Sequence, residues 1–314
     1  MPTLQPYFLN GASLSDATAV YTNSSLSIYA PNGWYSEGTI IREQIDGVLQ
    51  PVQPCPACGN PCGEAISGSG GTGVYKMNID TGETASDVGA IIVVFNPQNI
   101  PDGIKVVFNG VTYNEVSSEV YGWLGGVPAA LPIFLGRIAS QASCPAGSVI
   151  GGPFTLSTFE WDGTAFIPTG MTESVTVSAS QDRITVDGPS FCTMVIPKPS
   201  PVSSTVDITC YGVCSSTGFN ISVSCPTLLK KFKATVPVSE DPTLACELPI
   251  NQNYYVANVN GAYPYIGLYD WVFLDPYGIN KAPDGYYRTN NVIAPNDTIR
   301  IANGVIDEII SACP

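Results

Sequence analysis

The sequence predicts an all-β fold, with a central β-sandwich of jelly-roll or immunoglobulin-like type between two related small β-hairpin modules. Three observations predict it. The chain of 314 residues has 31 glycines and 27 prolines but only 12% charged residues, which favours turns and strands over helices. Short apolar runs recur with turn residues between them. A stretch near the N-terminus, residues 20–35, recurs without a gap at residues 272–287.

The repeated stretch has the chemistry of a turn followed by an aromatic strand. Both copies contain Ala-Pro-(Asn/Asp)-Gly and then two aromatic residues, and both continue to an (Asp/Asn)-Gly-Val turn at 46–48 and 303–305. Because Asn-Gly and Asp-Gly favour tight turns, we expect the same backbone path in both copies, with turns at residues 32–33 and 284–285. Small hairpins are marginal alone, so their aromatic residues are expected to anchor interfaces. These residues are Trp34, Tyr35, Tyr286 and Tyr287.

Composition shifts along the chain predict four segments. Residues 1–66 form an N-terminal β-hairpin module with a cysteine cluster, and residues 67–76 read as a flexible Gly/Ser linker. Residues 77–232 form the β-sandwich, and residues 233–314 form a C-terminal β module that repeats the N-terminal motif. The linker contains G-x-G-x-x-G from Gly68 to Gly73, but a dinucleotide site needs a strand before this pattern and a helix after it. Phosphate binding is therefore not predicted.

Within the sandwich, residues 90–95 form a continuous apolar run that is typical of a strand buried on both faces. Two hairpins are predicted around Asn109-Gly110 and Asp162-Gly163. Further strands are predicted at residues 192–196, 205–210 and 219–225.

Two of these segments carry a resemblance. Residues 100–110, Ile-Pro-Asp-Gly-Ile-Lys-Val-Val-Phe-Asn-Gly, resemble a strand pair of β-sandwich domains in secreted and surface proteins. Residues 217–226 resemble the last strand of such domains, with Phe219 in place of its usual tryptophan. More broadly, the order of parts resembles virion structural proteins of tailed phages that infect aquatic Bacteroidetes and similar hosts. This resemblance implies a particle component of the tail, a fibre or the capsid surface, and it implies no catalytic residues.

Ten cysteines leave three alternatives open. The densest group is Cys55, Cys58 and Cys62, and C-x-x-C on a Gly/Pro-rich segment is a zinc-ligand spacing. Because the chain has no histidine, a closed zinc site needs a fourth thiolate, such as that of Cys313 or Cys246. The other two alternatives are disulfides formed after release from the cell and reduced, unliganded thiols.

Sugars and calcium are two further ligand types that residues of this chain could bind. Exposed aromatic residues could stack on sugar rings, and the candidates are Trp123, Tyr263 and Tyr265, although such residues more often belong to cores or interfaces. Loop aspartates could hold calcium, but no EF-hand spacing exists, and solvation of the loops is the favoured interpretation. The aspartates are Asp80, Asp87, Asp102, Asp182 and Asp187.

Charge and composition narrow the function. A net charge of −14 with only 12 Lys and Arg argues against nucleic-acid binding, which needs a basic face. The absence of histidine removes the usual general bases, so no enzyme activity is predicted. No signal peptide and no apolar run near the ~20 residues of a membrane span are visible, so synthesis in a host cytoplasm is expected.

These observations predict a virion protein that assembles with other virion proteins and forms a homo-oligomer. A carbohydrate-binding adhesin that recognises host-surface glycans is the alternative, and a glycan-degrading enzyme is a weaker one.

Overall fold

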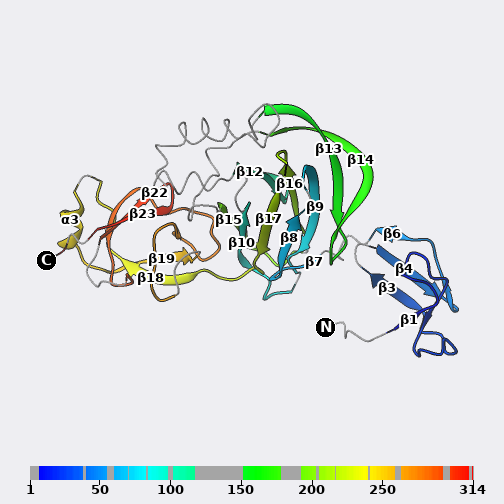
Figure 1. The fold of residues 1–314 in the computed structure, drawn as a ribbon. Helices are drawn as coiled ribbons and strands as arrows, with labels where there is room; N and C mark the ends of the chain where they lie inside the picture. The colour runs from blue at the N-terminus through cyan, green and yellow to red at the C-terminus, as the bar shows by residue number, and fades with distance from the viewer. Residues whose placement is uncertain are drawn as a thin grey trace.

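The structure is a computed structural model. It describes residues 7–37, 40–54, 60–69, 71–82, 84–97, 102–116, 151–177, 192–202, 205–215, 217–239, 241–258, 263–292, 298–310 and 313. The predicted all-β class is confirmed, because strands form nearly all of the regular structure in these ranges, with one short helix, α3 (Pro242–Cys246). Figure 1 shows three parts, with the sandwich between an N-terminal and a C-terminal module.

The central part is a sandwich of two sheets. The first has the order β15 (Cys192–Lys198), β10 (Gly89–Asn96), β17 (Gly218–Val223), β8 (Ala65–Ser69). The second has the order β12 (Val111–Val116), β11 (Gly103–Phe108), β16 (Thr205–Gly212), β9 (Gly73–Asp80), β13 (Gly151–Trp161), β14 (Phe166–Val177), with β7 (Asn60–Pro61) beside β9. One apolar cluster contains inward-facing residues of both sheets, so the core lies between them. The finer expectation of a jelly-roll or immunoglobulin-like topology stays a prediction.

The continuous apolar run of β10 arises because its two faces are buried in two different apolar clusters. Ile91, Val93 and Phe95 face the sandwich core, as the period of two requires. Ala90 and Ile92 face the other way and pack into a second cluster with residues of the C-terminal module. The strand is apolar on both faces because a separate part of the chain covers its outer face.

The predicted linker at residues 67–76 is wrong, because β8 and β9 occupy most of this range as sandwich strands. Its glycines serve close packing instead of flexibility. A Cβ on Gly68 would lie 2.3 Å from Cζ of Phe219, and one on Gly73 would lie 2.7 Å from Cε2 of Phe159. The sandwich therefore begins before residue 77, and it ends before residue 232, because β18 (Lys230–Ala234) belongs to the C-terminal sheet.

The two segments that carried the β-sandwich resemblance meet in the structure. Asp102 and Thr217 are both buried, and the hydroxyl of Thr217 donates to Oδ1 of Asp102 at 3.3 Å. The predicted hairpins are also present. Asn109 and Gly110 have φ of 48° and 76° between β11 and β12, and Asp162-Gly163 lies between β13 and β14.

The C-terminal module is one six-stranded sheet. Its order is β18, β19 (Gln252–Ala257), β20 (Trp271–Phe273), β23 (Val305–Ile310), β22 (Thr298–Ala302), β21 (Gly285–Arg288). Its own apolar cluster includes Phe232, Tyr254, Val272 and Tyr287.

The N-terminal module has the strands β1 (Phe8–Leu9), β2 (Val20–Tyr21), β3 (Gly33–Glu37), β4 (Ile40–Ile45), β5 (Val48–Leu49) and β6 (Gln53–Pro54). β1 pairs with β2, while β4 pairs with β3, β5 and β6. Its buried core is small and consists of Leu14, Ala17, Val20, Ala30 and Leu49.

The two modules share one backbone path, as the repeat predicted. Tyr21 bridges Tyr29 as Phe273 bridges Lys281, and the Ala30 amide donates to Val20 as the Ala282 amide donates to Val272. The β3–β4 register, Gly33 with Gln44, corresponds to the β21–β22 register, Gly285 with Ile301. β1–β2 corresponds in the same way to β19–β20, so the repeat extends beyond the stretch that the sequence revealed.

The predicted tight turns at residues 32–33 and 284–285 are wrong. Gly33 and Gly285 begin the strands β3 and β21. The hairpin turns lie at Asp46-Gly47 and Asn303-Gly304, where all four residues have positive φ. The side-chain oxygens of Asn32 and Asp284 instead accept the amides of Asp46 and Asn303, both at 2.7 Å, so each repeated Asn/Asp fixes the turn opposite it.

Candidate assembly surface

The C-terminal module packs one face against the sandwich. Ala257, Trp271 and Phe273 are buried there against β10 and β15, with Tyr255 and Val305 partly buried beside them. The rings of Trp271 and Phe273 are stacked with centroids 6.2 Å apart. The ammonium of Lys281 lies 4.6 Å from the Trp271 ring centroid, which is a cation–π distance.

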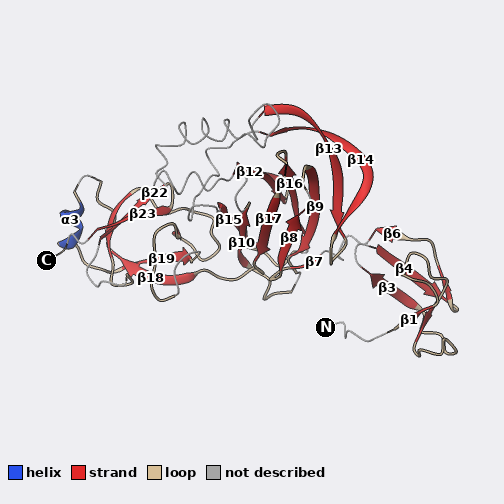
Figure 2. Cartoon of the chain, in the orientation of Figure 1, coloured by secondary structure: helices blue, strands red, loops and turns tan. Residues whose placement is uncertain are grey.

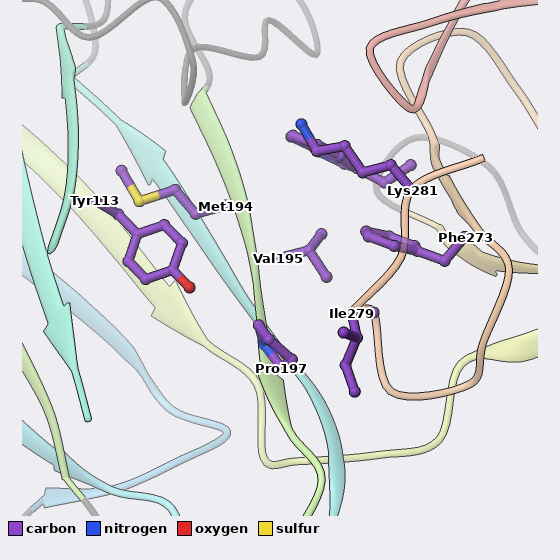
Figure 3. Close-up of a pocket in the computed structure, with 9 residues that line it drawn as sticks. Tyr113, Met194, Val195, Pro197, Phe273, Ile279 and Lys281 are labelled. Carbon is purple, nitrogen blue, oxygen red and sulfur yellow. The ribbon is translucent and has the colours of Figure 1, made fainter. Parts of the chain in front are cut away.

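A cavity of about 190 Å³ lies at this junction. Figure 3 shows Tyr113, Met194 and Pro197 of the sandwich on one side, and Phe273, Ile279 and Lys281 of the C-terminal module on the other. Its lining residues come from both parts, so the cavity is a gap left where the C-terminal module meets the sandwich.

The loop at residues 275–280 lies directly against the sandwich. The carboxylate of Asp275 fixes it by accepting the amides of Ile279 at 3.1 Å and Asn280 at 2.7 Å. Gly278 has φ of 76°, and a Cβ there would lie 3.1 Å from Cγ1 of Val195. Glycine therefore permits both the left-handed backbone and the close approach.

The corresponding loop of the N-terminal module has the same conformation. Asn23 accepts the amides of Ser27 and Ile28, as Asp275 does for Ile279 and Asn280. Leu26 stands where the other module has Gly278, and it keeps a left-handed φ of 53°. Its side chain is exposed, so no glycine is needed for close approach at this position.

Part of the face that the C-terminal module packs against the sandwich is more exposed in the N-terminal module: Phe273 and Gly278 are buried and Tyr255 and Val305 partly buried, whereas Lys281 is exposed in its own module. We define the docking face as the five residues that correspond to Tyr255, Phe273, Gly278, Lys281 and Val305, and these are Phe8, Tyr21, Leu26, Tyr29 and Val48. Tyr29 is 57% and Val48 is 58% exposed. The rings of Tyr21 and Tyr29 stack with centroids 5.1 Å apart, which gives the face a flat aromatic centre. A contiguous exposed patch of this kind is typical of a protein–protein contact.

Polar side chains hold this face in place, because the apolar core beneath it is small. The guanidinium of Arg42 donates to the carbonyls of Leu14, Ser15, Ala17, Leu49 and Gln50 at 2.6–3.2 Å. The buried amide of Gln44 accepts the Val20 amide and donates to the Val20 and Ala30 carbonyls. The planar fork of arginine can satisfy several carbonyls at once, so this one side chain connects residues 14–17 with residues 49–50.

The four predicted interface residues fall into two groups. Trp34 is 53% exposed, and Tyr35 and Tyr286 are partly buried. Tyr287 is fully buried, so its prediction as an interface residue is wrong. Its hydroxyl donates to the Pro283 carbonyl at 2.6 Å, and burial raises the pKa of the phenol. Tyr254 of β19 packs on Tyr287 as Tyr7 packs on Tyr35, but no described strand of the N-terminal module corresponds to β18, and Tyr35 is only partly buried.

Of the predicted sugar contacts, Tyr263 and Tyr265 are 51% and 49% exposed on one loop of the C-terminal module. Trp123 lies outside the described residues.

Two of the cysteines that were candidate zinc ligands, Cys62 and Cys313, form disulfides instead. Cys62 is bonded to Cys225 and Cys313 to Cys246, so none of these thiolates is available to a metal. Cys55 and Cys58 lie outside the described residues. Cys62–Cys225 links the entry and the exit of the sandwich, and Cys246–Cys313 links α3 to the end of β23, so both stabilise the fold.

The aspartates that were weighed as calcium ligands form no metal site among the described residues. Within the described ranges no group of three or more acidic or cysteine side chains could hold a metal ion. Asp80 and Asp87 accept local amides, and Asp102 is buried in the sandwich. Asp182 and Asp187 lie outside the described residues.

Sequence reasoning missed most of the docking face. Tyr21 and Tyr29 were part of the repeated stretch, but their contact could not be known from the pattern. When the two copies of the repeat are aligned with each other, both carry apolar or long side chains at these positions, and this pattern was the available signal. The missing information was which copy meets a second sheet.

Comparisons with protein-family models, with curated proteins and with solved structures find no match. In the part of the chain that the structure describes, no helix is long and apolar enough to cross a membrane.

Proposed function

We propose that this protein is a structural component of a phage virion that acts through assembly and not through catalysis. The observation that carries the proposal is the docking face, which is largely exposed in the N-terminal module, while four of its five counterparts in the C-terminal module, all but Lys281, are buried or partly buried against the sandwich. The module is built to rest on a β-sheet surface, and its natural partner is another protein of the particle. The virion setting comes from the resemblance in the order of the chain's parts.

The chemistry of the chain supports an assembly role. It has no histidine, and a net charge of −14 keeps free subunits apart until a specific patch is met. Aromatic residues are the usual anchors of specific interfaces, and Tyr21 and Tyr29 provide a preformed pair.

The test is incorporation of a double variant, Tyr29→Ser with Val48→Ser, into particles. Both side chains are more than half exposed, so the variant should fold, and removing them should strongly reduce its copy number in purified particles. The matched control is Ile167→Ser with Met171→Ser, which removes two exposed apolar side chains from β14, and it should enter at the normal copy number. Normal incorporation of the docking-face variant would contradict the proposal.

A second candidate function, binding of host-surface glycans, is favoured by Tyr263 and Tyr265. Two half-exposed tyrosines on one loop offer ring faces for sugar stacking. Glycan-array binding that is lost in Tyr263→Ala with Tyr265→Ala would support an adhesin, and an array without signal would remove it.

A further inference from the structure

The C-terminal module is closed by one extended segment that has no counterpart among the described residues of the N-terminal module. Residues 230–238 pair with β19 on one side, where Lys231 faces Tyr255 and Phe232 faces Tyr254. The same segment then pairs with β21 on the other side, where Val238 and Tyr286 exchange hydrogen bonds of 3.0 and 2.7 Å. The Thr235 amide also donates to the Arg288 carbonyl at 3.0 Å. One segment therefore satisfies both edges of the sheet.

In the described part of the N-terminal module, both of the corresponding edges are unpaired. Among the described residues, β1 pairs only with β2, and β3 pairs only with β4. Because β3 and β21 have the same register, the outward backbone groups of Tyr286 and Arg288 correspond to those of Trp34 and Ser36. Open strand edges are sites at which another strand can add.

The side chains beneath the opening match those that the segment covers. Tyr7 and Tyr35 pack edge to face with centroids 5.2 Å apart, and Tyr254 and Tyr287 do the same at 5.3 Å. The covered pair is 4% and 0% exposed, whereas Tyr7 is 40% exposed. Phe232 covers the pair in the C-terminal module, with its centroid 5.9 Å from that of Tyr254.

We propose that the N-terminal module is completed in trans by a β-strand of another protein, an extended basic segment of the same kind as residues 230–238. This inference rests on the proposed assembly function and specifies its mode. The strand would place an aromatic side chain over Tyr7 and Tyr35, and it would pair with the backbone of Trp34 and Ser36.

Charge favours a basic strand. Residues 230–238 hold three lysines, all exposed, out of only 12 Lys and Arg in the chain. The N-terminal module between residues 7 and 54 carries the four carboxylates of Asp16, Glu37, Glu43 and Asp46, against the single cation of Arg42, which is bound to five carbonyls. An acidic acceptor attracts a basic strand and repels further copies of this acidic chain.

The experiment measures binding of a synthetic peptide with the sequence of residues 229–239 to the purified full-length protein. The peptide should bind with 1:1 stoichiometry, and a peptide with Asp in place of Phe232 should not bind. Ser36→Pro removes one outward amide on β3 and blocks strand addition, and proline is tolerated at an exposed sheet edge. It should weaken peptide binding at least about tenfold, which corresponds to ~1.4 kcal/mol, while the matched Ser36→Ala variant should bind like the wild type.

Each other outcome overturns the proposal. Absence of binding, or equal binding to Ser36→Pro and Ser36→Ala, would show that this edge accepts no strand. A wild-type protein that self-associates and becomes monomeric in Ser36→Pro would make a second copy of this chain the occupant. Because the experiment uses purified protein, its failure leaves the particle-incorporation test of the assembly role unaffected.

Discussion

Two aspartates of the sandwich are shifted in opposite directions by their surroundings. Asp102 is fully buried, and this burial raises the pKa of its carboxyl well above the ordinary 3.8, although the hydrogen bond from Thr217 acts in the opposite sense. Asp162 is exposed in the β13–β14 turn, where hydrogen bonds from Ala165 and Thr164 lower the pKa of its carboxyl. The first residue therefore favours the folded state in acid, and the second favours it at higher pH.

This contrast predicts the effect of Asp102→Asn on stability. A raised pKa gives a stabilising contribution that is complete below the ordinary pKa of the unfolded chain and is lost as pH rises through the folded pKa. Asp102→Asn should therefore be more stable than the wild type at neutral pH, and the difference should vanish once the pH falls below the ordinary 3.8. Denaturant unfolding at both pH values measures it. A variant that is less stable at neutral pH would contradict the assigned direction, and Asp162→Asn, the control, should show the opposite sign.

At the scale of elements, the repeated turns could be predicted from the sequence because Asn, Asp and Gly tolerate positive φ and few other residues do. Asp46-Gly47 and Asn303-Gly304 form the hairpin turns, as expected. The prediction of a flexible linker at residues 67–76 also rested on glycine, and it was wrong because glycine permits close packing as well as flexibility. Gly68 and Gly73 lie under aromatic rings. Composition cannot separate these two uses, since the ring that covers a glycine comes from a distant strand.

Gly47 has both a left-handed backbone and a close contact with an aromatic ring, so its turn should respond to alanine differently from the turn at Gly110. Gly47 and Gly110 have φ of 78° and 76°, so alanine at either position should cost roughly 1 kcal/mol or more for the left-handed backbone. A Cβ on Gly47 would also lie 2.9 Å from the Tyr29 ring, whereas nothing lies within 4 Å of one on Gly110. Gly47→Ala should therefore destabilise its module more than Gly110→Ala destabilises the sandwich.

Hydrogen exchange read separately in β3–β4 and β11–β12 measures the two costs. It compares each variant with the wild type in the part that contains the change. Equal losses of protection would mean that Tyr29 moves aside freely and is not a fixed part of the docking face.

At the scale of the whole molecule, two copies of one module have different surroundings. The C-terminal copy is closed by residues 230–238 and packs on the sandwich, while the described part of the N-terminal copy has an unpaired strand edge and a largely exposed docking face. The repeat itself was visible in the sequence because local turn chemistry encodes it. The difference between the copies was not, because it depends on contacts between residues far apart in the chain. Tyr287, predicted to be an interface residue, is core for this reason.

The most direct test of the account is oxidative footprinting of the wild-type protein, free and in intact particles. The account predicts that Tyr29 and Trp34 are oxidised readily in the purified protein, where they are 57% and 53% exposed, and become strongly protected in the particle. Met171, which is 62% exposed on β14, serves as the internal reference and should react in both states. Equal oxidation of Tyr29 in the free protein and in the particle would contradict the claim that the N-terminal module is the assembly surface.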